Sequence, residues 1–303
     1  MDSPARRNVY SRCRAPHGSA TGAPLVTQTP VDLHALARRI RRHVVRMVFE
    51  AKSGHIGGSL SATDILTVLY ASVLRHDPQR PDWPARDRFV MSKGHCTPVQ
   101  YAVLAEFGYL PVEELATFRR AGSRLQGHSV LGRPPGAENS AGSLGMGLSF
   151  GLGIQLAARV QGLDIHSYVL MGDGEQDEGQ VWEAAMAAAH HRAGGLVALI
   201  DRNGIQNDDF TAKTMSTEPL DEKYRAFGWT VRAGVDGHDL DAIVEALRWA
   251  RDVRGQPTCV IFDTIKGKGV SFMQSNPAFH GAPPTPEQFE QAMRELADGA
   301  DGS

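Results

Sequence analysis

Two polar residues stand where consecutive strand-like runs of the sequence end. Asp173 lies in a Gly-Asp-Gly-Glu sequence directly after the run 167–171, and Asn203 follows the run 196–201. A carboxylate and an amide at neighbouring strand ends can share one hard cation, and Mg²⁺ commonly completes its oxygen shell with water and phosphate. The glycines let a phosphate approach the backbone, and residues 178–191 read as a helix whose N-terminus favours an anion. The first hypothesis is therefore a diphosphate-bearing cofactor, although Gly-Asp-Gly is also an ordinary turn sequence.

Gly-rich loops carry four further candidates for chemistry, which are His55, His95, His128 and His280. An imidazole can donate to phosphate oxygens or move protons near neutral pH. A single histidine of this kind is more often structural, but four in the same context favour a ligand site. Lys93 and Lys266 would add positive charge for a phosphate, or else they are solvated loop lysines.

The elements that must position these residues follow from hydrophobic periodicity. Apolar spacing predicts early helices over 31–52, 61–74 and 98–107. From residue 143 onward helices and strands alternate, with helices at 143–161, 178–191, 220–227 and 240–252 and strands at 167–172, 196–201, 229–235 and 258–265. This alternation predicts an α/β fold with a mostly parallel sheet and helices on both faces. Ligands of such sheets lie at the carboxyl ends of the strands, where Asp173 and Asn203 fall.

Bulk properties narrow the class of protein. The 303 residues are 42% apolar and 22% charged with a net charge of −2, which predicts no nucleic-acid or membrane preference. Three scattered cysteines suggest neither a disulfide framework nor a metal cluster, so we expect a reducing cytoplasm. Residues 1–29 are Arg-rich and lack apolar periodicity, which predicts a disordered N-terminal extension or, less in keeping with the pattern, an organelle transit peptide. One compact domain over residues 30–303 is the simplest division.

The motifs also occur in the order known from one enzyme family. From about residue 35 to about residue 285 the chain resembles the N-terminal, diphosphate-binding part of transketolase. The matching stretches are Ser53-Gly54-His55, residues 88–95, Gly142-Ser143-Leu144-Gly145-Met146-Gly147, residues 172–175 with 178–179 and 182–184, Asp201-Arg202-Asn203, residues 226–229, residues 236–238, and His280-Gly281. The resemblance implies the thiamine-diphosphate-binding fold.

A role for each matched residue follows from this resemblance. Asp173, Asn203 and the backbone carbonyl of Ile205 would bind the metal, which is Mg²⁺ with Ca²⁺ or Mn²⁺ as substitutes. His95, Gly174 and His280 would hold the diphosphate of thiamine diphosphate, and Lys266 would add charge there. The backbone of Gly142 and Leu144 would face the cofactor. The substrate channel would be lined by His55, His128 and His280, and Glu175 matches an acidic position beside the cofactor, near the contact between subunits.

A transketolase continues into a pyrimidine-binding domain and a C-terminal domain, which these 303 residues do not contain. In the family the pyrimidine-binding domain supplies the glutamate that activates the cofactor. We therefore expect one subunit of a split transketolase, a transferase that moves a two-carbon ketol group from a ketose phosphate to an aldose phosphate. It would be inactive without a separate pyrimidine-binding subunit. An α₂β₂ assembly follows, with the Gly-rich helix from Leu144 as a candidate apolar interface.

Other readings stay open. The chain is alternatively a subunit of a specialised transketolase-like enzyme acting on an unusual sugar in a biosynthetic or catabolic pathway, or a non-catalytic cofactor-binding partner. The α subunit of a 2-oxo acid dehydrogenase also has a Gly-Asp-Gly and Asn pair, but the His55 and His95 loops argue against it. A dinucleotide-binding protein is disfavoured because no Gly-x-Gly-x-x-Gly opens a helix with an acid at the expected distance.

Overall fold

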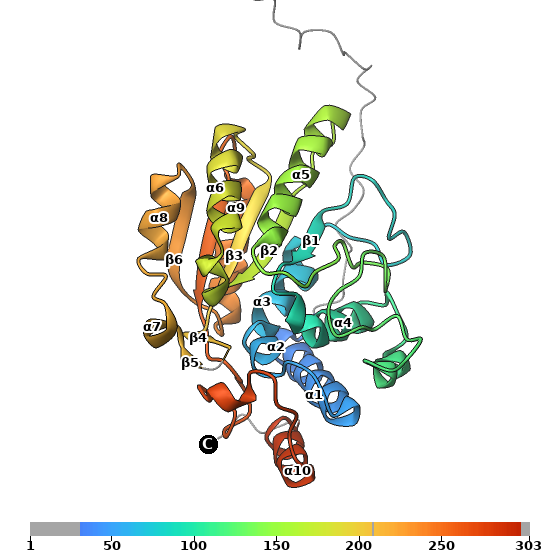
Figure 1. Ribbon diagram of the computed structural model, residues 1–303. Helices are drawn as coiled ribbons and strands as arrows, with labels where there is room; N and C mark the ends of the chain where they lie inside the picture. Colours follow the sequence, from blue (N-terminus) through green and yellow to red (C-terminus); the bar gives the residue numbers. More distant parts are fainter. Residues whose placement is uncertain (1–30, 208, 298–303) are drawn as a thin grey trace, which may run out of the picture.

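A five-stranded parallel sheet forms the centre of the molecule (Figure 1). The structure, a computed structural model, describes residues 31–207 and 209–297, so the extension predicted over residues 1–29 lies outside the described residues. The strands run in the order β1 (Arg88–Met91), β2 (Ser167–Gly172), β3 (Leu196–Arg202), β7 (Thr258–Asp263) and β6 (Thr230–Asp236). All four pairings are parallel. The predicted α/β fold class is therefore confirmed.

Side chains of the central strands alternate between two hydrophobic cores, as the two-residue period of a strand requires. In β2, Tyr168 and Leu170 point into one core, whereas Val169 and Met171 point into the other. The other central strands repeat this pattern, and their buried residues are almost fully shielded from solvent. Burial on both faces explains why these strands read as continuous apolar runs in the sequence.

Helices cover both faces of the sheet. One face is packed by α5 (Met146–Gln161), α6 (Gly179–His190) and α8 (Leu220–Ala226). The other core includes residues of α1 (Leu33–Ala51), α2 (Gly57–Ser61), α3 (Thr63–Val68), η1 (Leu69–Val73, a π-helix), α4 (Thr97–Glu106), α9 (Leu240–Asp252) and α10 (Pro286–Glu295). Figure 1 shows α6 in front of the sheet and α9 behind it.

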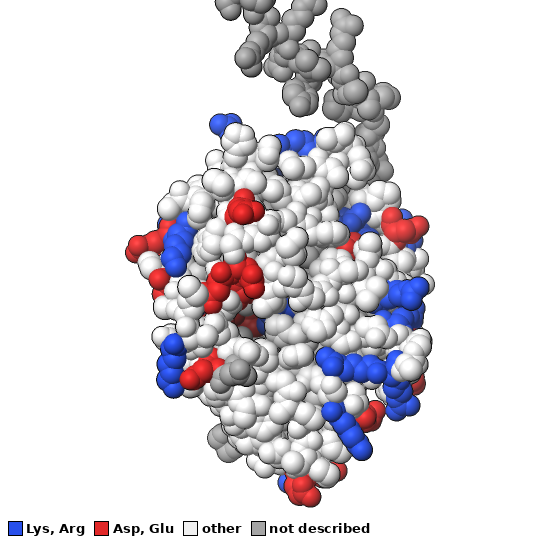
Figure 2. All heavy atoms as spheres, viewed as in Figure 1, with Lys and Arg blue, Asp and Glu red and all other residues white. Residues whose placement is uncertain are grey.

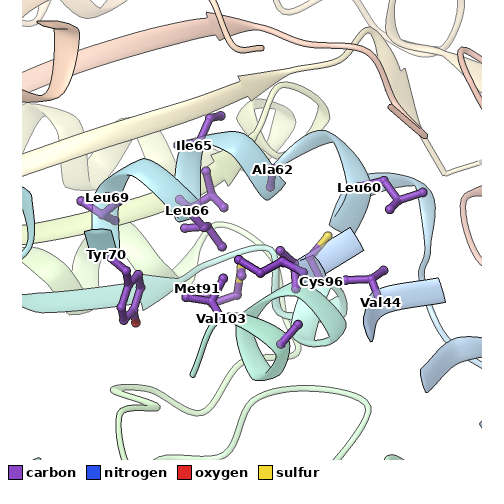
Figure 3. Packing of buried hydrophobic residues seen from close by; sticks show 14 of the residues in the cluster. Val44, Leu60, Ala62, Ile65, Leu66, Leu69, Tyr70, Met91, Cys96 and Val103 are labelled. Carbon is purple, nitrogen blue, oxygen red and sulfur yellow. The ribbon is translucent and has the colours of Figure 1, made fainter. Parts of the chain in front are cut away.

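The N-terminal helices pack on one another through small and branched apolar side chains (Figure 3). Val44 of α1 lies close to Cys96, while Leu66 of α3 faces Met91 at the end of β1. The Asp32 carboxylate accepts a hydrogen bond from the Ala35 amide at 3.0 Å and caps α1. This packing fixes the loops that follow α1 and β1, which carry two of the predicted site histidines.

Several elements differ from the sequence-based expectation. The helix predicted over 61–74 is divided into part of α2, α3 and the π-helix η1. Strand β1 was not predicted, and neither was α10 nor the hairpin of β4 (Ile205–Gln206) and β5 (Asp209–Phe210). Short helices η2 (Gly94–Cys96), η3 (Val112–Thr117), η4 (Gly174–Asp177), α7 (Thr211–Thr214) and η5 (Pro277–Phe279) complete the described chain. No helix within the described ranges has the length and apolar character that crossing a membrane requires.

Candidate active site

One cavity of about 440 Å³ opens at the edge of the sheet where the strands end at their carboxyl termini. Segments far apart in the sequence meet here, namely the loops after α1, β1, β2, β3 and β7 and the stretch between residues 117 and 146. All thirteen residues singled out from the sequence line this cavity: His55, Lys93, His95, His128, Gly142, Leu144, Asp173, Gly174, Glu175, Asn203, Ile205, Lys266 and His280. The topology therefore brings the whole predicted set together.

Asp173 lines the cavity, and a second buried acid, Asp201, lies close to it without lining the cavity. Asp173 follows β2 and is 3% exposed, and its Oδ2 accepts a hydrogen bond from the Gly204 amide at 2.8 Å. Asp201 lies near the end of β3, paired in register with Gly172 of β2. Burial, together with the negative charge of Asp201, raises the pKa of Asp173 to about 6. A cation at this position would relieve both effects.

Asp201 already has a cationic partner, which is Lys93. The Lys93 ammonium donates to Asp201 Oδ2 and to the Gly58 carbonyl, the latter at 3.0 Å. Both side chains are almost completely buried. Although burial opposes ionisation of Asp201, the Lys93 charge and hydroxyl donors hold its pKa below the usual value. Lys93 is thus neither a solvated loop lysine nor an unpaired charge, because its ammonium is committed to Asp201.

Two of the three predicted metal-binding groups, Asn203 and the Ile205 carbonyl, lie close together along the chain after β3, whereas the third, Asp173, follows β2. Asn203 Oδ1 accepts from the Ile205 amide at 3.2 Å, and the Ile205 carbonyl accepts from Lys266 Nζ at 2.9 Å. The same ammonium lies 2.7 Å from His280 Nδ1, and burial lowers the pKa of Lys266 to about 8. An amide oxygen, a carbonyl and a carboxylate are hard oxygen donors that suit Mg²⁺ in the company of phosphate oxygens.

Side chains alone do not make a metal site here. Within residues 31–207 and 209–297, no group of three or more His, Cys, Asp or Glu residues could hold a metal ion. A cation in this cavity would depend on one carboxylate, neutral oxygen donors and oxygens from a ligand. The donor set therefore fits a cation that arrives with a diphosphate.

Four imidazoles form one wall of the cavity. The ring of His55 lies 5.1 Å from that of His95, 6.2 Å from that of His128 and 5.3 Å from that of His280, measured between centroids. Burial and neighbouring positive charge lower the pKa of His55 to about 4 and that of His280 to about 3. The pKa values of His95 and His128 are also lowered, mainly by burial. At pH 7 each ring is neutral and offers one donor and one acceptor nitrogen.

Backbone close to the cavity is kept accessible by glycine. A side chain at Gly174 would place its Cβ 2.4 Å from the Cβ of Gln206, so only glycine fits there. Gly142, by contrast, borders open space within the cavity. These two positions allow a ligand to approach the main chain at two sides of the cavity.

Glu175 has a different environment from the one expected for a ligand. Its buried carboxylate accepts hydrogen bonds from the Ser92 hydroxyl, from the Gly145 amide at 2.9 Å and from the Gly172 amide at 3.1 Å. Burial raises the pKa of this carboxyl. Glu175 thus joins the end of β2 to the loop that carries Gly142 and Leu144.

Sequence reasoning missed the role of Asp201, the buried acid that pairs with Lys93 and helps to raise the pKa of Asp173. It was read as the last residue of a strand, and a charged residue closing an otherwise apolar run was the available signal. Gly58, Asp177, Glu178 and Gln206 also line the cavity without having been singled out as ligands.

Comparison with known proteins identifies the family. Residues 33–299 match the model described as transketolase, thiamine diphosphate binding domain. The chain belongs to the transketolase family. The predicted resemblance to its N-terminal part is thereby confirmed, as is a domain for binding thiamine diphosphate.

Two curated relatives match this transketolase chain almost from end to end. It is 42% identical to the 6-deoxy-6-sulfo-D-fructose transketolase subunit SqwG of Clostridium sp. (strain MSTE9), over 89% of this chain and 98% of the relative. It is 41% identical to an apulose-4-phosphate transketolase subunit of Phocaeicola vulgatus, over 88% and 94% of the two chains. Both relatives are named as subunits.

Solved transketolases share the fold over a smaller part of their length. The transketolase of Pichia stipitis in complex with sedoheptulose 7-phosphate superposes with a TM-score of 0.84 at 33% identity, over 89% of this chain and 41% of that one. The Campylobacter jejuni enzyme gives a TM-score of 0.83 at 31% identity, over 89% and 43%. The present chain therefore corresponds to about two fifths of these larger transketolases.

Proposed function

We propose that this chain is the diphosphate-binding subunit of a transketolase that moves a two-carbon ketol group from a ketose phosphate to an aldose phosphate. The observation that carries the proposal is the single cavity in which the family's motif residues meet. Residues 30–303 would form the diphosphate-binding domain. A cytoplasmic location is proposed with it, in keeping with the scattered cysteines.

Each part of the cavity has a proposed task in holding the cofactor. Asp173, Asn203 and the Ile205 carbonyl would bind Mg²⁺, with Ca²⁺ or Mn²⁺ as substitutes. The residues that would hold thiamine diphosphate are His95, Gly142, Leu144, Gly174, Lys266 and His280, with Glu175 bracing the loop of Gly142. When bound, this cofactor supplies a nucleophilic carbon and an electron sink for the transferred fragment.

The histidine wall would act on the sugar. Because His55, His128 and His280 are neutral at pH 7, each can donate a hydrogen bond to a sugar oxygen through one nitrogen and accept a proton at the other. Mg²⁺ bound by Asp173, Asn203 and the Ile205 carbonyl would meanwhile hold the diphosphate.

A specialised sugar is favoured by the comparisons. The relatives that match nearly their whole length, at 41–42% identity, are named for a sulfofructose and for apulose 4-phosphate. Escherichia coli transketolase 2 is 35% identical and is matched over 41% of its length. We therefore propose an uncommon ketose with an anionic group as the donor or product, with the general transketolase reaction as the alternative.

A second subunit would complete the active site, in an α₂β₂ assembly. The naming of both relatives as subunits supports this, and so does the surface of α5, where Met146, Phe150 and Val160 are 52%, 41% and 88% exposed. Figure 2 shows that the surface over most of α5 carries no charged side chains. Exposed apolar residues on one helix face are typical of a protein interface.

The test is reconstitution with a second, pyrimidine-binding subunit. This chain, that subunit, and the mixture of the two are each assayed with thiamine diphosphate, Mg²⁺ and a panel of ketose donors that includes phosphorylated and sulfonated sugars. We expect ketol transfer only from the mixture. Transfer by this chain alone would contradict the split site, and a stable complex without transfer from any donor would favour the non-catalytic alternative.

A further inference from the structure

Arg119 lies behind the histidine wall without lining the cavity. It follows η3, and its backbone has a φ of +60°, a conformation that side-chain-bearing residues rarely adopt. Its amide donates to the Leu125 carbonyl at 2.8 Å, which closes the loop leading to His128. A strained backbone retained beside a functional cavity calls for a compensating role of the side chain.

The guanidinium of Arg119 contacts both histidine loops. Its Nη1 donates to the Ser53 hydroxyl at 2.8 Å, two residues before His55. Its Cζ would lie only 2.6 Å from a Cβ at Gly127, so the group packs directly on the backbone that precedes His128. Its Nε is buried and has no hydrogen-bond partner among the described residues.

We propose that Arg119 is a positioning residue, which ties the loop of His55 to the loop of His128 and thereby fixes the spacing of the two imidazoles. The tether needs glycine at 127, since any side chain there would displace the guanidinium. It also needs the hydroxyl of Ser53 as the acceptor. That the two histidines act on the sugar rests on the proposed function, whereas the tether itself does not.

The charge of Arg119 acts on the same two rings. The groups that face His55 are the imidazoles of His95, His128 and His280 and the cations Lys266 and Arg119. Burial and then the Arg119 charge lower the pKa values of both His55 and His128. Removing a neighbouring positive charge makes protonation easier, so the pKa of each ring rises in a variant that lacks the guanidinium.

The test is NMR titration of the full chain with histidine labelled at Cε1, without cofactor or substrate. In Arg119→Gln we expect the pKa values of His55 and His128 each to rise by about one unit. Arg119→Lys retains the charge and should leave both values nearly in place. Arg124→Gln is the matched control, because Arg124 lies on the same loop but pairs with Glu114 on the surface at 2.6 Å. Unchanged titration of both rings in Arg119→Gln overturns the proposal.

A second variant separates the tether from the charge and covers a failure of Arg119→Gln to fold. Ser53→Ala removes only the acceptor, so amide hydrogen exchange should quicken at residues 53–55 and 126–128 together while the histidine pKa values stay in place. Exchange that is unchanged in both loops contradicts the tether.

Activity distinguishes this inference from the proposed function. With the second subunit present, Arg119→Lys should lower kcat/KM by about tenfold, because a small misplacement of catalytic groups slows the chemical step. A wild-type mixture without ketol transfer would defeat the proposed function, yet the titrations would still decide the role of Arg119. If Arg119→Lys keeps the kcat/KM of the wild type and amide hydrogen exchange in both loops is unchanged in Ser53→Ala, Arg119 has no positioning role.

Discussion

The buried ion pair between Lys93 and Asp201 permits a quantitative prediction. Replacing Lys93 by Met removes the ammonium and leaves the Asp201 carboxylate buried near Asp173. Loss of one partner from a buried pair costs about 3–5 kcal/mol. Asp201 retains donors from the Ser61 hydroxyl at 2.6 Å and from other polar side chains. We therefore expect the lower end of this range, about 3 kcal/mol of unfolding free energy at pH 7.

The pH dependence of this loss follows from the direction of the pKa shift. In the wild type the pKa of Asp201 is lowered, so its contribution to stability is present above the unfolded pKa and is lost as the pH falls. In Lys93→Met the pKa of Asp201 rises, because burial and Asp173 are no longer opposed. The carboxyl then takes up a proton more readily, and the difference from the wild type shrinks as the pH falls toward 5.

Urea unfolding at pH 7 and pH 5, followed by tryptophan fluorescence, measures both effects. Lys213→Met is the control, because Lys213 forms an exposed pair with Asp209 at 3.4 Å, whose loss costs less than about 1 kcal/mol. Adding Asp201→Asn to Lys93→Met should restore part of the lost stability. A loss in Lys93→Met no larger than in Lys213→Met, or one that grows toward pH 5, would refute the reasoning.

Two further predictions concern packing and pH. Gly147→Ala on α5 places a Cβ 2.3 Å from the Cβ of Ser92 and should lower the free energy of unfolding by about 1–3 kcal/mol. Gly153→Ala on the same helix meets open space and should raise the free energy of unfolding by up to about 1 kcal/mol. Equal midpoints of the two variants in thermal unfolding would contradict this. Burial lowers the pKa values of His55 and His280 to about 4 and about 3, so native stability should fall as the pH drops from 6.5 through 4. The slope of the unfolding free energy against pH should flatten in a His55→Asn, His280→Asn double variant, by up to about 1 kcal/mol per pH unit for each ring. An unchanged slope, measured by urea unfolding, would argue against neutral rings.

Much of the fold could be predicted because its periodicities are long and regular. The helix from Leu33 to Ala51 has buried residues at one face, and the strands after residue 143 are bounded by glycine or polar residues. Strand β1 has only four residues, a run too short to distinguish strand from helix. The final helix α10 did carry a signal, since Thr285 and Gln288 form a capping box.

For the site, the sequence indicates which residues meet but not how their charges are arranged. Loops rich in glycine and histidine predict a ligand cavity, and the topology places them at one edge of the sheet. The partner of Lys93 is 108 positions away and the acceptor of Arg119 is 66 positions away. Contacts at such separations depend on tertiary packing, so neither the buried ion pair nor the tether has a local sequence signal.

The central claim is that Asp173 and Asn203 anchor a metal that holds the diphosphate of thiamine diphosphate. Calorimetric titration of thiamine diphosphate into the complex with the second subunit, with Mg²⁺ and again with a chelator, tests it most directly. We predict binding that weakens by about 100-fold or more without the metal and equally in Asp173→Asn. Equal affinity with Mg²⁺ and with the chelator, or wild-type affinity in Asp173→Asn, would contradict the claim.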